Sequence, residues 1–243
     1  MLQVLLGSVL LLFFLSLTLI DSHGIVPFEK INTPYEVVTH KVFLDISVEH
    51  QPLKRIHIVL FGNAMPKLVE NFRRLCTGEM GTNKDGVKLH YKGTLMPKTQ
   101  RYAWIEGGDL KRNNNTQGVS TYGEEIFADN FNLGHNGRGY VTMKPEDLSG
   151  KFSSLFTIIN RKLDYFDNHY AVIGKVLYEE ERLWLRNVTR YHGTEMGHCN
   201  WYVDAGRVKL YTPHIEILDS GELPLDGSET FILNPDYYKK DDL

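Results

Sequence analysis

The sequence predicts a mainly β domain, built as a closed or nearly closed antiparallel barrel with helices at its ends. From about residue 41 onward, short apolar runs alternate with turn residues, which is typical of antiparallel strands. Two segments instead carry apolar residues at helical spacing. So few helices beside many short strands favour a barrel that the helices cap. The 243 residues, 42% of them hydrophobic and 23% charged, fit one folded domain with short extensions.

The expected strands begin with a hairpin. Residues 42–48 and 55–61 read VFLDISV and RIHIVLF, two β-rich runs joined by a loop that contains Pro52. Further strand candidates are 102–106, 139–143, 156–160, 171–176 and 214–218.

Two helices are expected. The first begins near Pro66, because proline is favoured in the first turn of a helix. Its apolar face consists of Leu68, Val69, Phe72, Leu75 and Cys76. This pattern makes Cys76 a core residue rather than a reactive one. The second helix is expected over 179–186, with Leu183 and Trp184 facing inward.

The N-terminus allows three interpretations. Residues 2–20 contain no charged residue and form one apolar segment. They fit a signal peptide that occupies 1–24 and is cleaved after small residues, although no Lys or Arg precedes the apolar run. They also fit an uncleaved anchor, since this length spans a bilayer. A buried helix is the third reading, but the segment has no polar face. Either of the first two directs the chain to the secretory pathway: the endoplasmic reticulum lumen, the exterior, or a membrane-anchored form.

Two further signals are consistent with that compartment. Asn114 and Asn187 each begin an Asn-x-Thr sequon and are candidate glycosylation sites. The chain ends in Lys-Asp-Asp-Leu at 240–243, one acidic residue different from the Lys-Asp-Glu-Leu retention signal. The alternative is an ordinary acidic tail.

The predicted organisation has four parts. After residues 1–24 comes a linker over 25–40, then the folded domain over 41–223. Residues 224–243 contain prolines and few packing positions, which predicts a mobile C-terminal tail.

Composition and motifs exclude several classes of protein. With 27 basic and 30 acidic residues the net charge is −3, so a nucleic-acid binder is not expected. Cys76 and Cys199 are the only cysteines and form no CxxC pair, which excludes a disulfide scaffold and a zinc ribbon. No phosphate-loop, HExxH or GxSxG motif occurs, and no histidines have metal-ligand spacing. We therefore expect no cofactor and no metal. Whether Cys76 and Cys199 form one disulfide stays open.

Several strings, taken in order, resemble the cyclophilin-type peptidyl-prolyl isomerases. They are VFLDISV, ENFRRLCTGE at 70–79, YKG at 91–93, EGGD at 106–109, YGE at 122–124, GYVTM at 139–143 and IGKV at 173–176. The similarity covers roughly residues 41–223. It implies a closed eight-stranded antiparallel barrel capped by two α-helices, a monomer, and a proline-containing polypeptide as ligand.

The loop between Thr77 and Tyr91 resembles that of the divergent-loop cyclophilins. In those proteins the cysteine equivalent to Cys76 has a cysteine partner, but here that position is Ser220. Their redox bridge therefore does not transfer.

The catalytic position departs from the family. Rotation of an Xaa-Pro bond crosses a barrier of about 18–20 kcal/mol that amide resonance sets. The family directs an arginine at the proline nitrogen, which gains a lone pair as the amide twists. Where the family has Phe-His-Arg, this chain has Met96-Pro97-Lys98. Lys98 keeps the charge but loses the rigid planar fork of arginine.

The other positions implied to form the substrate site have changed as well. They are Met96, Ala103, Trp104, Glu106, Lys144, Pro145, Glu146, Ser154, Phe156, Tyr165, Phe166 and Tyr170. Only Phe156 keeps the family's residue. Pro145 stands in the segment that grips the substrate backbone, and it has no N–H to donate. A retained barrel with a changed site predicts a pseudoenzyme.

Two features suggest reorganisation of the surface. The family's arginine and a glutamine beside it have become Lys98 and Glu106, which predicts an ion pair; the alternative is two solvated charges. The stretch after Val176 is aromatic and histidine-rich, and is either a partner-binding patch or packing over the barrel end. Its residues are Tyr191, His192, His198, Trp201, Tyr202 and Tyr211.

The leading hypothesis is a cyclophilin-like domain of the secretory pathway with weak or lost isomerase activity. It would act in protein folding or bind a proline-containing polypeptide or another protein partner. The alternatives are an active isomerase with altered specificity and an interaction protein tethered to a membrane through residues 2–20.

Overall fold

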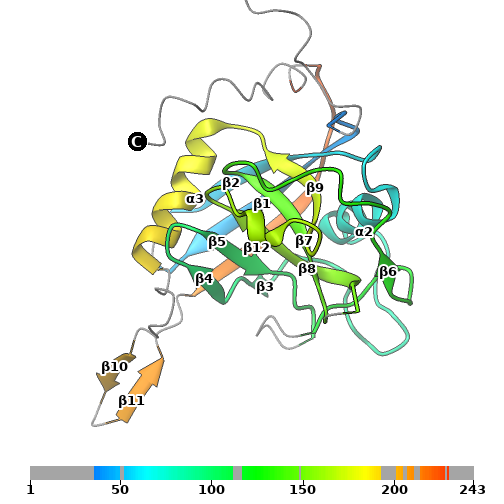
Figure 1. Cartoon of the computed structure of the whole chain (residues 1–243). Helices are drawn as coiled ribbons and strands as arrows, with labels where there is room; N and C mark the ends of the chain where they lie inside the picture. The colour runs from blue at the N-terminus through cyan, green and yellow to red at the C-terminus, as the bar shows by residue number, and fades with distance from the viewer. Residues whose placement is uncertain are drawn as a thin grey trace, which may run out of the picture. The chain divides into compact units, whose positions relative to one another are not determined.

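The strands form one antiparallel sheet that curls around a core, and two helices pack against it (Figure 1). The computed structural model describes residues 36–49, 52–111, 117–147, 149–192, 201–204, 207–210, 214–227 and 229. All of them belong to one unit of the chain, Asn32–Leu243. The interpretations placed on residues 1–24 and 240–243, on Asn114 and on Cys199 lie outside the described residues.

The main sheet has ten strands. They are β1 (His40–Val48), β2 (Lys54–Leu60), β3 (Thr94–Leu95), β4 (Lys98–Gln100), β5 (Trp104–Gly107), β6 (Ile126–Phe127), β7 (Tyr140–Pro145), β8 (Lys151–Ile159), β9 (Ala171–Val176) and β12 (Ile215–Leu223). Their order is β3-β12-β1-β2-β9-β7-β8-β5-β4, and β6 pairs with β8. The strands at the two ends of this order, β3 and β4, are separated only by residues 96 and 97, so the sheet curls back toward itself. The predicted antiparallel fold with two capping helices is confirmed, but the described sheet has ten strands rather than eight, and its end strands β3 and β4 are not paired with each other.

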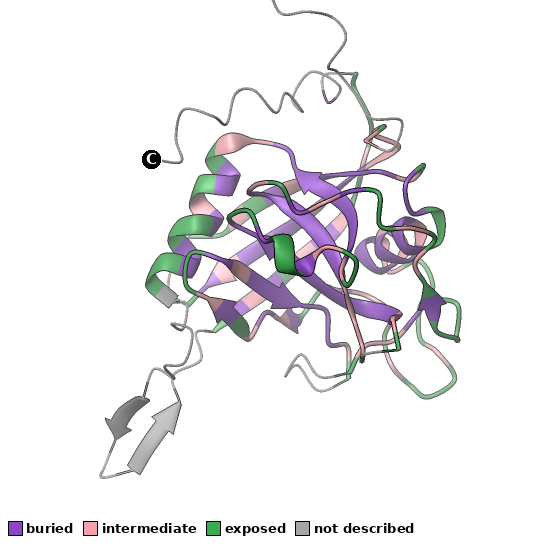
Figure 2. Ribbon diagram, in the orientation of Figure 1, coloured by how far each residue is buried: buried purple, intermediate pink, exposed green. Residues whose placement is uncertain are grey.

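The core lies inside the curled sheet. On β1, Val42, Leu44, Ile46 and Val48 alternate along the strand and are fully buried. Figure 2 shows the same burial along most of the other strands. Strand β8 is buried along nearly its whole length and begins at Lys151, five residues before the predicted start. The prediction missed these residues because Ser153 and Ser154 interrupt the apolar run.

The first helix is α2 (Pro66–Thr77), which packs against β1, β8 and β12. It has the predicted proline in its first turn and ends at Gly78, whose φ of 69° is left-handed. Cys76 is fully buried, as predicted, and burial raises the pKa of its thiol.

The second helix is α3 (Glu179–His192), which packs against β2, β5 and β9 and begins with three glutamates. It runs six residues beyond the predicted end. The inward face contains Leu185 and Val188, while Leu183 is 42% exposed. The predicted inward position of Leu183 is therefore wrong, because a helix with Leu185 inside turns residue 183 outward. Neither α2 nor α3, nor any other helix in the described ranges, is long and apolar enough to span a membrane.

A second, two-stranded sheet is the hairpin of β10 (Trp201–Asp204) and β11 (Arg207–Leu210). It lies within the predicted aromatic patch. Tyr191 at the end of α3 is 69% exposed, while His198, Tyr211 and the side chains of Trp201 and Tyr202 lie outside the described set. The role of the patch stays a prediction.

An ion-pair network ties α2 to the sheet and makes stability depend on pH. Arg73 pairs with Glu70 at 2.8 Å, with Glu79 at 2.7 Å and with Glu222 of β12 at 2.9 Å. Arg74 adds a second pair to Glu70 at 2.7 Å. The hydrogen bond from Arg73, against the opposing effect of burial, lowers the pKa of Glu70 from 4.5 to about 2.

A carboxylate whose pKa is lower in the folded state contributes stability above its unfolded pKa and loses it in acid. We expect Glu70 to lose on the order of 1 kcal/mol of stabilisation as the pH falls from about 4.5 towards 2. Chemical denaturation at pH 6, 4 and 3 checks this. Glu70→Gln should flatten the acid limb, whereas Glu124→Gln, at an exposed turn, should not. Equal slopes in both variants would contradict the assignment.

Candidate active site

The sheet order brings the predicted site residues onto neighbouring strands. They lie on β4, β5, β7 and β8, in the turns beside them, and around the short helix η2 (Asp164–Phe166). Register places Lys98 opposite Glu106, and Phe156 opposite both Gly107 and Met143. Positions up to about 70 residues apart in the chain, from Met96 to Phe166, thus come together at one end of the sheet.

The centre of this region is a buried carboxylate. Glu106 is only 3% exposed, and Lys144 Nζ donates to its Oε2 at 2.7 Å. Lys98 is the cross-strand neighbour of Glu106 in the β4–β5 pair, which is consistent with the predicted ion pair, and that pair stays a prediction. Sequence reasoning missed the Lys144 contact. The carboxylate is thus held by a cation from β7, and removal of that cation would raise the free-energy cost of keeping the carboxylate buried.

The segment that would grip a substrate backbone is occupied by internal contacts. Pro145 has no N–H, and the ladder between β7 and β8 shifts register between Met143 and Pro145. The N–H of Glu146 donates to the Lys151 carbonyl at 2.7 Å. The Glu146 carboxylate accepts from Gly118 N at 3.1 Å and from the Ser153 hydroxyl. Neither residue 145 nor residue 146 therefore offers a backbone donor to a peptide.

Four predicted pocket residues have no exposed surface: Met96, Ala103, Ser154 and Phe156. The Phe156 ring packs edge-on against Phe72 and Tyr91, with centroids 5.3 Å and 5.1 Å away. Ser154 Oγ donates to the Gly108 carbonyl at 2.6 Å and accepts from Val119 N at 2.9 Å. In this structure these four side chains belong to the core beneath the candidate active site. A ligand would contact the more exposed residues of the site instead.

An aromatic cluster fills the end of the region nearest η2. Phe166 and Tyr170 stack with centroids 3.9 Å apart, and Tyr165, 58% exposed, meets Phe166 edge-on. Burial, then the charge of Glu106, raises the pKa of the Tyr170 hydroxyl. Seven of the predicted site residues are partly or fully exposed, and they offer a ligand aromatic rings and charges of both signs. They are Lys98, Trp104, Lys144, Pro145, Glu146, Tyr165 and Tyr170.

Sequence reasoning also missed a buried histidine at this end. His135 is fully buried; its Nδ1 lies 2.7 Å from Asp167 Oδ1 and its Nε2 lies 3.1 Å from Thr142 Oγ1. Burial lowers the pKa of the imidazole, against the opposing effect of Asp167. A single histidine without a motif gives no signal in the sequence. Its contacts fix the loop before β7 against η2.

Two other predicted positions can be placed. Ser220 Oγ donates to the Cys76 carbonyl at 2.8 Å, so the position that carries a cysteine in the divergent-loop proteins does lie beside Cys76. Asn187 is exposed on α3, while Thr189 of the same sequon is fully buried. Glycosylation at Asn187 stays a prediction.

Comparison with known proteins identifies the family. Residues 43–196 match the family model of the cyclophilin type peptidyl-prolyl cis-trans isomerases. This chain belongs to the cyclophilin family. It is 34% identical over 189 residues to the peptidyl-prolyl cis-trans isomerase CYP21-1 of Arabidopsis thaliana, and the aligned region covers 78% of each chain. It is 36% identical over 138 residues to the probable inactive peptidyl-prolyl cis-trans isomerase-like 6 of Bos taurus, which covers 56% of this chain and 44% of that protein.

Membership confirms the resemblance and gives the site its context. In a cyclophilin, the strands described above are the ones expected to carry the prolyl isomerase site. Here this region carries the buried carboxylate of Glu106 paired with the partly exposed Lys144, and Pro145 in the segment predicted to grip a substrate backbone. Beside the strands, the rings of Phe166 and Tyr170 stack. The cyclophilin fold is thus kept while the surface it presents has changed.

Proposed function

We propose that this protein is a cyclophilin-like binding domain whose prolyl isomerase activity is weak or lost. The observation that carries the proposal is the Glu106–Lys144 pair, 2.7 Å apart, across from Lys98 at the position of the family's arginine. The Glu106 carboxylate is 3% exposed and attracts the ammonium group of Lys98. In catalysis that positive charge would have to act on the proline nitrogen instead. A lysine also lacks the planar fork that fixes the aim of an arginine donor. The Bos taurus relative is named a probable inactive isomerase, which supports this proposal.

The ligand we propose is a proline-containing polypeptide or a protein partner in the secretory pathway, bound by a monomer. The exposed Tyr165 and the partly exposed Trp104 would supply apolar contact area, and Lys98 and Lys144 would favour acidic side chains beside the proline. The compartment is supported by the apolar residues 2–20 and the sequon at Asn187. Protein folding in the endoplasmic reticulum lumen is the cellular role that fits these features.

A second candidate is an active isomerase with altered specificity. Lys98 is exposed, and its charge could still stabilise a developing lone pair. The Arabidopsis thaliana relative is named as an isomerase, which favours this reading. A membrane-tethered interaction protein is the third candidate, and mass spectrometry of the mature N-terminus decides it.

Exchange spectroscopy by NMR tests the proposal. The full chain is expressed in a secretory host and mixed with a panel of Xaa-Pro peptides, whose uncatalysed exchange takes tens to hundreds of seconds. We expect less than about a tenfold acceleration, together with chemical-shift changes that report peptide binding. Exchange on the millisecond timescale would overturn the proposal and favour the altered isomerase.

A rebuilt variant provides the matched control. Lys98→Arg, Glu106→Gln and Pro145→Asn restore the family's residues at three positions, and circular dichroism checks that the fold is kept. An increase in exchange from this variant alone would tie the loss of activity to these residues.

A further inference from the structure

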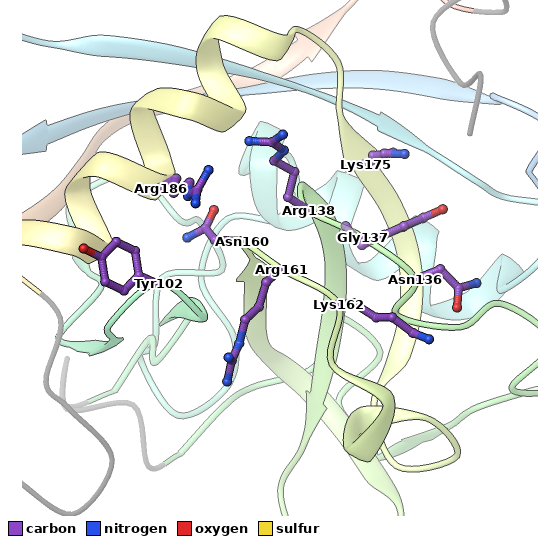
Figure 3. Close-up of a pocket in the computed structure, with 10 residues that line it drawn as sticks. Tyr102, Asn136, Gly137, Arg138, Asn160, Arg161, Lys162, Lys175 and Arg186 are labelled. Atoms are coloured by element: carbon purple, nitrogen blue, oxygen red, sulfur yellow. The ribbon is translucent and has the colours of Figure 1, made fainter. Parts of the chain in front are cut away.

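One cavity has a lining that includes none of the predicted site residues. It has a volume of about 180 Å³, and β7, β9, α3 and the turns after β4 and β8 contribute its walls (Figure 3). The lining residues are Tyr102, Asn136, Gly137, Arg138, Tyr140, Asn160, Arg161, Lys162, Lys175 and Arg186. One water needs roughly 10–15 Å³, so the cavity has room for a small solute.

The cavity is strongly cationic although the whole chain has a net charge of −3. Its lining, as far as the chain is described, includes Arg138, Arg161, Lys162, Lys175 and Arg186 but no carboxylate. Lysine and arginine gathered around a concave surface raise the local concentration of anions.

The nearby carboxylates are fewer than the cations. Glu179 pairs with Arg138 at 3.6 Å and with Arg182 at 2.8 Å, so it serves two guanidinium groups. Tyr140 donates its hydroxyl to Glu36 at 3.2 Å. Asp164 pairs with Lys162 at 3.1 Å, and both side chains are well exposed, so that pair contributes little.

Two of the cations are held in the wall itself. Arg138 is 9% exposed and Lys175 is 5% exposed, with the Lys175 ammonium 4.5 Å from the centre of the Tyr140 ring. Burial, then the charge of Arg182, lowers the pKa of Lys175 to about 8, against the opposing effects of Glu36 and Glu179. Arg138 already has Glu179 as a partner. Two cations in the wall of one cavity still attract an anion that enters it, because charges screened from bulk water interact more strongly.

Polar groups beside the cations indicate what the anion is attached to. Asn160 is 4% exposed, and its Oδ1 has no hydrogen-bond partner in the described part of the chain, although its Nδ2 reaches Thr189 Oγ1 at 3.2 Å. A buried acceptor of this kind is satisfied by a donor from water or a ligand. Tyr102 lines the rim with a ring that is 37% exposed. An anionic group on a small hydroxyl-bearing carrier fits these features.

We propose that this cavity binds a phosphate or sulfate ester of a small hydroxyl-bearing molecule. The tetrahedral oxyanion would lie against Arg138 and Lys175, and Arg161 and Arg186, which line the same cavity, add positive charge. Guanidinium groups bind such oxyanions through paired, charge-assisted hydrogen bonds. The site does not depend on the outcome for isomerase activity, because its lining shares no residue with the candidate active site.

Titration of the full chain at constant ionic strength tests the proposal, followed by NMR. The probes are inorganic phosphate, inorganic sulfate, glucose 6-phosphate and glucose. We expect saturable binding of the anions, with shifts at the Asn160 side-chain amide and around Gly137. Tighter binding of glucose 6-phosphate than of phosphate would show that the carrier is recognised, and equal binding would show that the oxyanion alone is. Failure of every anion to saturate below 50 mM, or equal binding of glucose, would overturn the proposal.

Charge-reversal variants locate the site. Arg161→Glu with Arg186→Glu changes two exposed rim residues and should weaken anion binding at least tenfold. The matched control, Lys67→Glu with Lys88→Glu, changes the net charge equally at exposed positions outside the lining. Equal weakening in both variants would mean a general charge effect and would refute a specific site.

The pH dependence gives a separate readout. An anion stabilises the charged form of Lys175, so affinity should fall as the pH rises through about 8. The charged groups that face Lys175 are Arg182 and Glu179 from α3, Glu36 before β1, and the Tyr140 ring from β7. Lys175→Gln should remove this pH dependence, and a retained dependence would overturn the role assigned to Lys175.

Discussion

Gly108→Ala is expected to destabilise the protein by about 4 kcal/mol or more, a large fraction of the total stability of a typical domain. Gly108 has a φ of 96°, and a Cβ placed on it would lie 2.1 Å from the Ser154 carbonyl oxygen and 3.0 Å from the Phe156 ring. The carbonyl oxygen cannot move aside freely, because the buried hydroxyl of Tyr91 donates to it at 2.8 Å. The substitution therefore combines backbone strain with overlap in the floor of the candidate active site.

Chemical denaturation measures this effect, with the slope checked for two-state behaviour. Gly123→Ala is the matched control, since Gly123 also has a left-handed φ of 75° but a Cβ there would meet nothing within 4 Å. It should lose only about 1 kcal/mol, the strain alone. If the two variants lose similar amounts, overlap with Ser154 is not the cause.

Asn71→Leu is expected to lose about 3–4 kcal/mol. Asn71 is fully buried on α2, where its Nδ2 donates to the Ser153 carbonyl at 2.6 Å. Its Oδ1 accepts from both the backbone N–H and the hydroxyl of Thr121, at 2.8 Å and 2.9 Å. One amide thus joins α2, β8 and the loop over 117–123. Leucine has a similar size but leaves these three groups buried without partners.

Hydrogen exchange at the Thr121 amide distinguishes this account from a general packing defect. The Thr121 amide should lose protection in Asn71→Leu well before the amides of β1 do. Asn130→Leu is the control, because Asn130 is only partly buried and donates one side-chain bond, to the Ala64 carbonyl at 2.9 Å. It should lose less than about 1 kcal/mol. Unchanged protection at Thr121 in Asn71→Leu would contradict the bridging role.

The long elements could be predicted from their patterns. The apolar face of α2 and the alternation on β1 each extend over enough residues for their period to be recognised. Strands β3, β4 and β6 contain two or three residues each, which is too short for any period. They exist because longer neighbours pair with them, so only the folded sheet defines them.

The site shows the same division. The resemblance to the family placed Lys98 and Glu106 beside each other, and the β4–β5 register agrees. The hydrogen bond between Lys144 and Glu106 could not be predicted from the sequence. The two residues are 38 positions apart, and only the strand order β5, β8, β7 brings them together. The burial of Phe156 is likewise a property of packing, since Phe72 and Tyr91 come from other parts of the chain.

Three features could be read from the order of residues along the chain: the resemblance to the cyclophilins, the places of the long strands and of the first helix, and the lysine at the position of the family's arginine. These are local features, or strings of residues that keep their order along the chain. Only the fold shows that Lys144 contacts the buried carboxylate of Glu106, which of the predicted pocket residues lie in the core, and that Arg138, Lys175 and Arg186 line one cavity. Such contacts join residues distant in sequence, and only the pairing and packing of whole strands and helices bring them within reach.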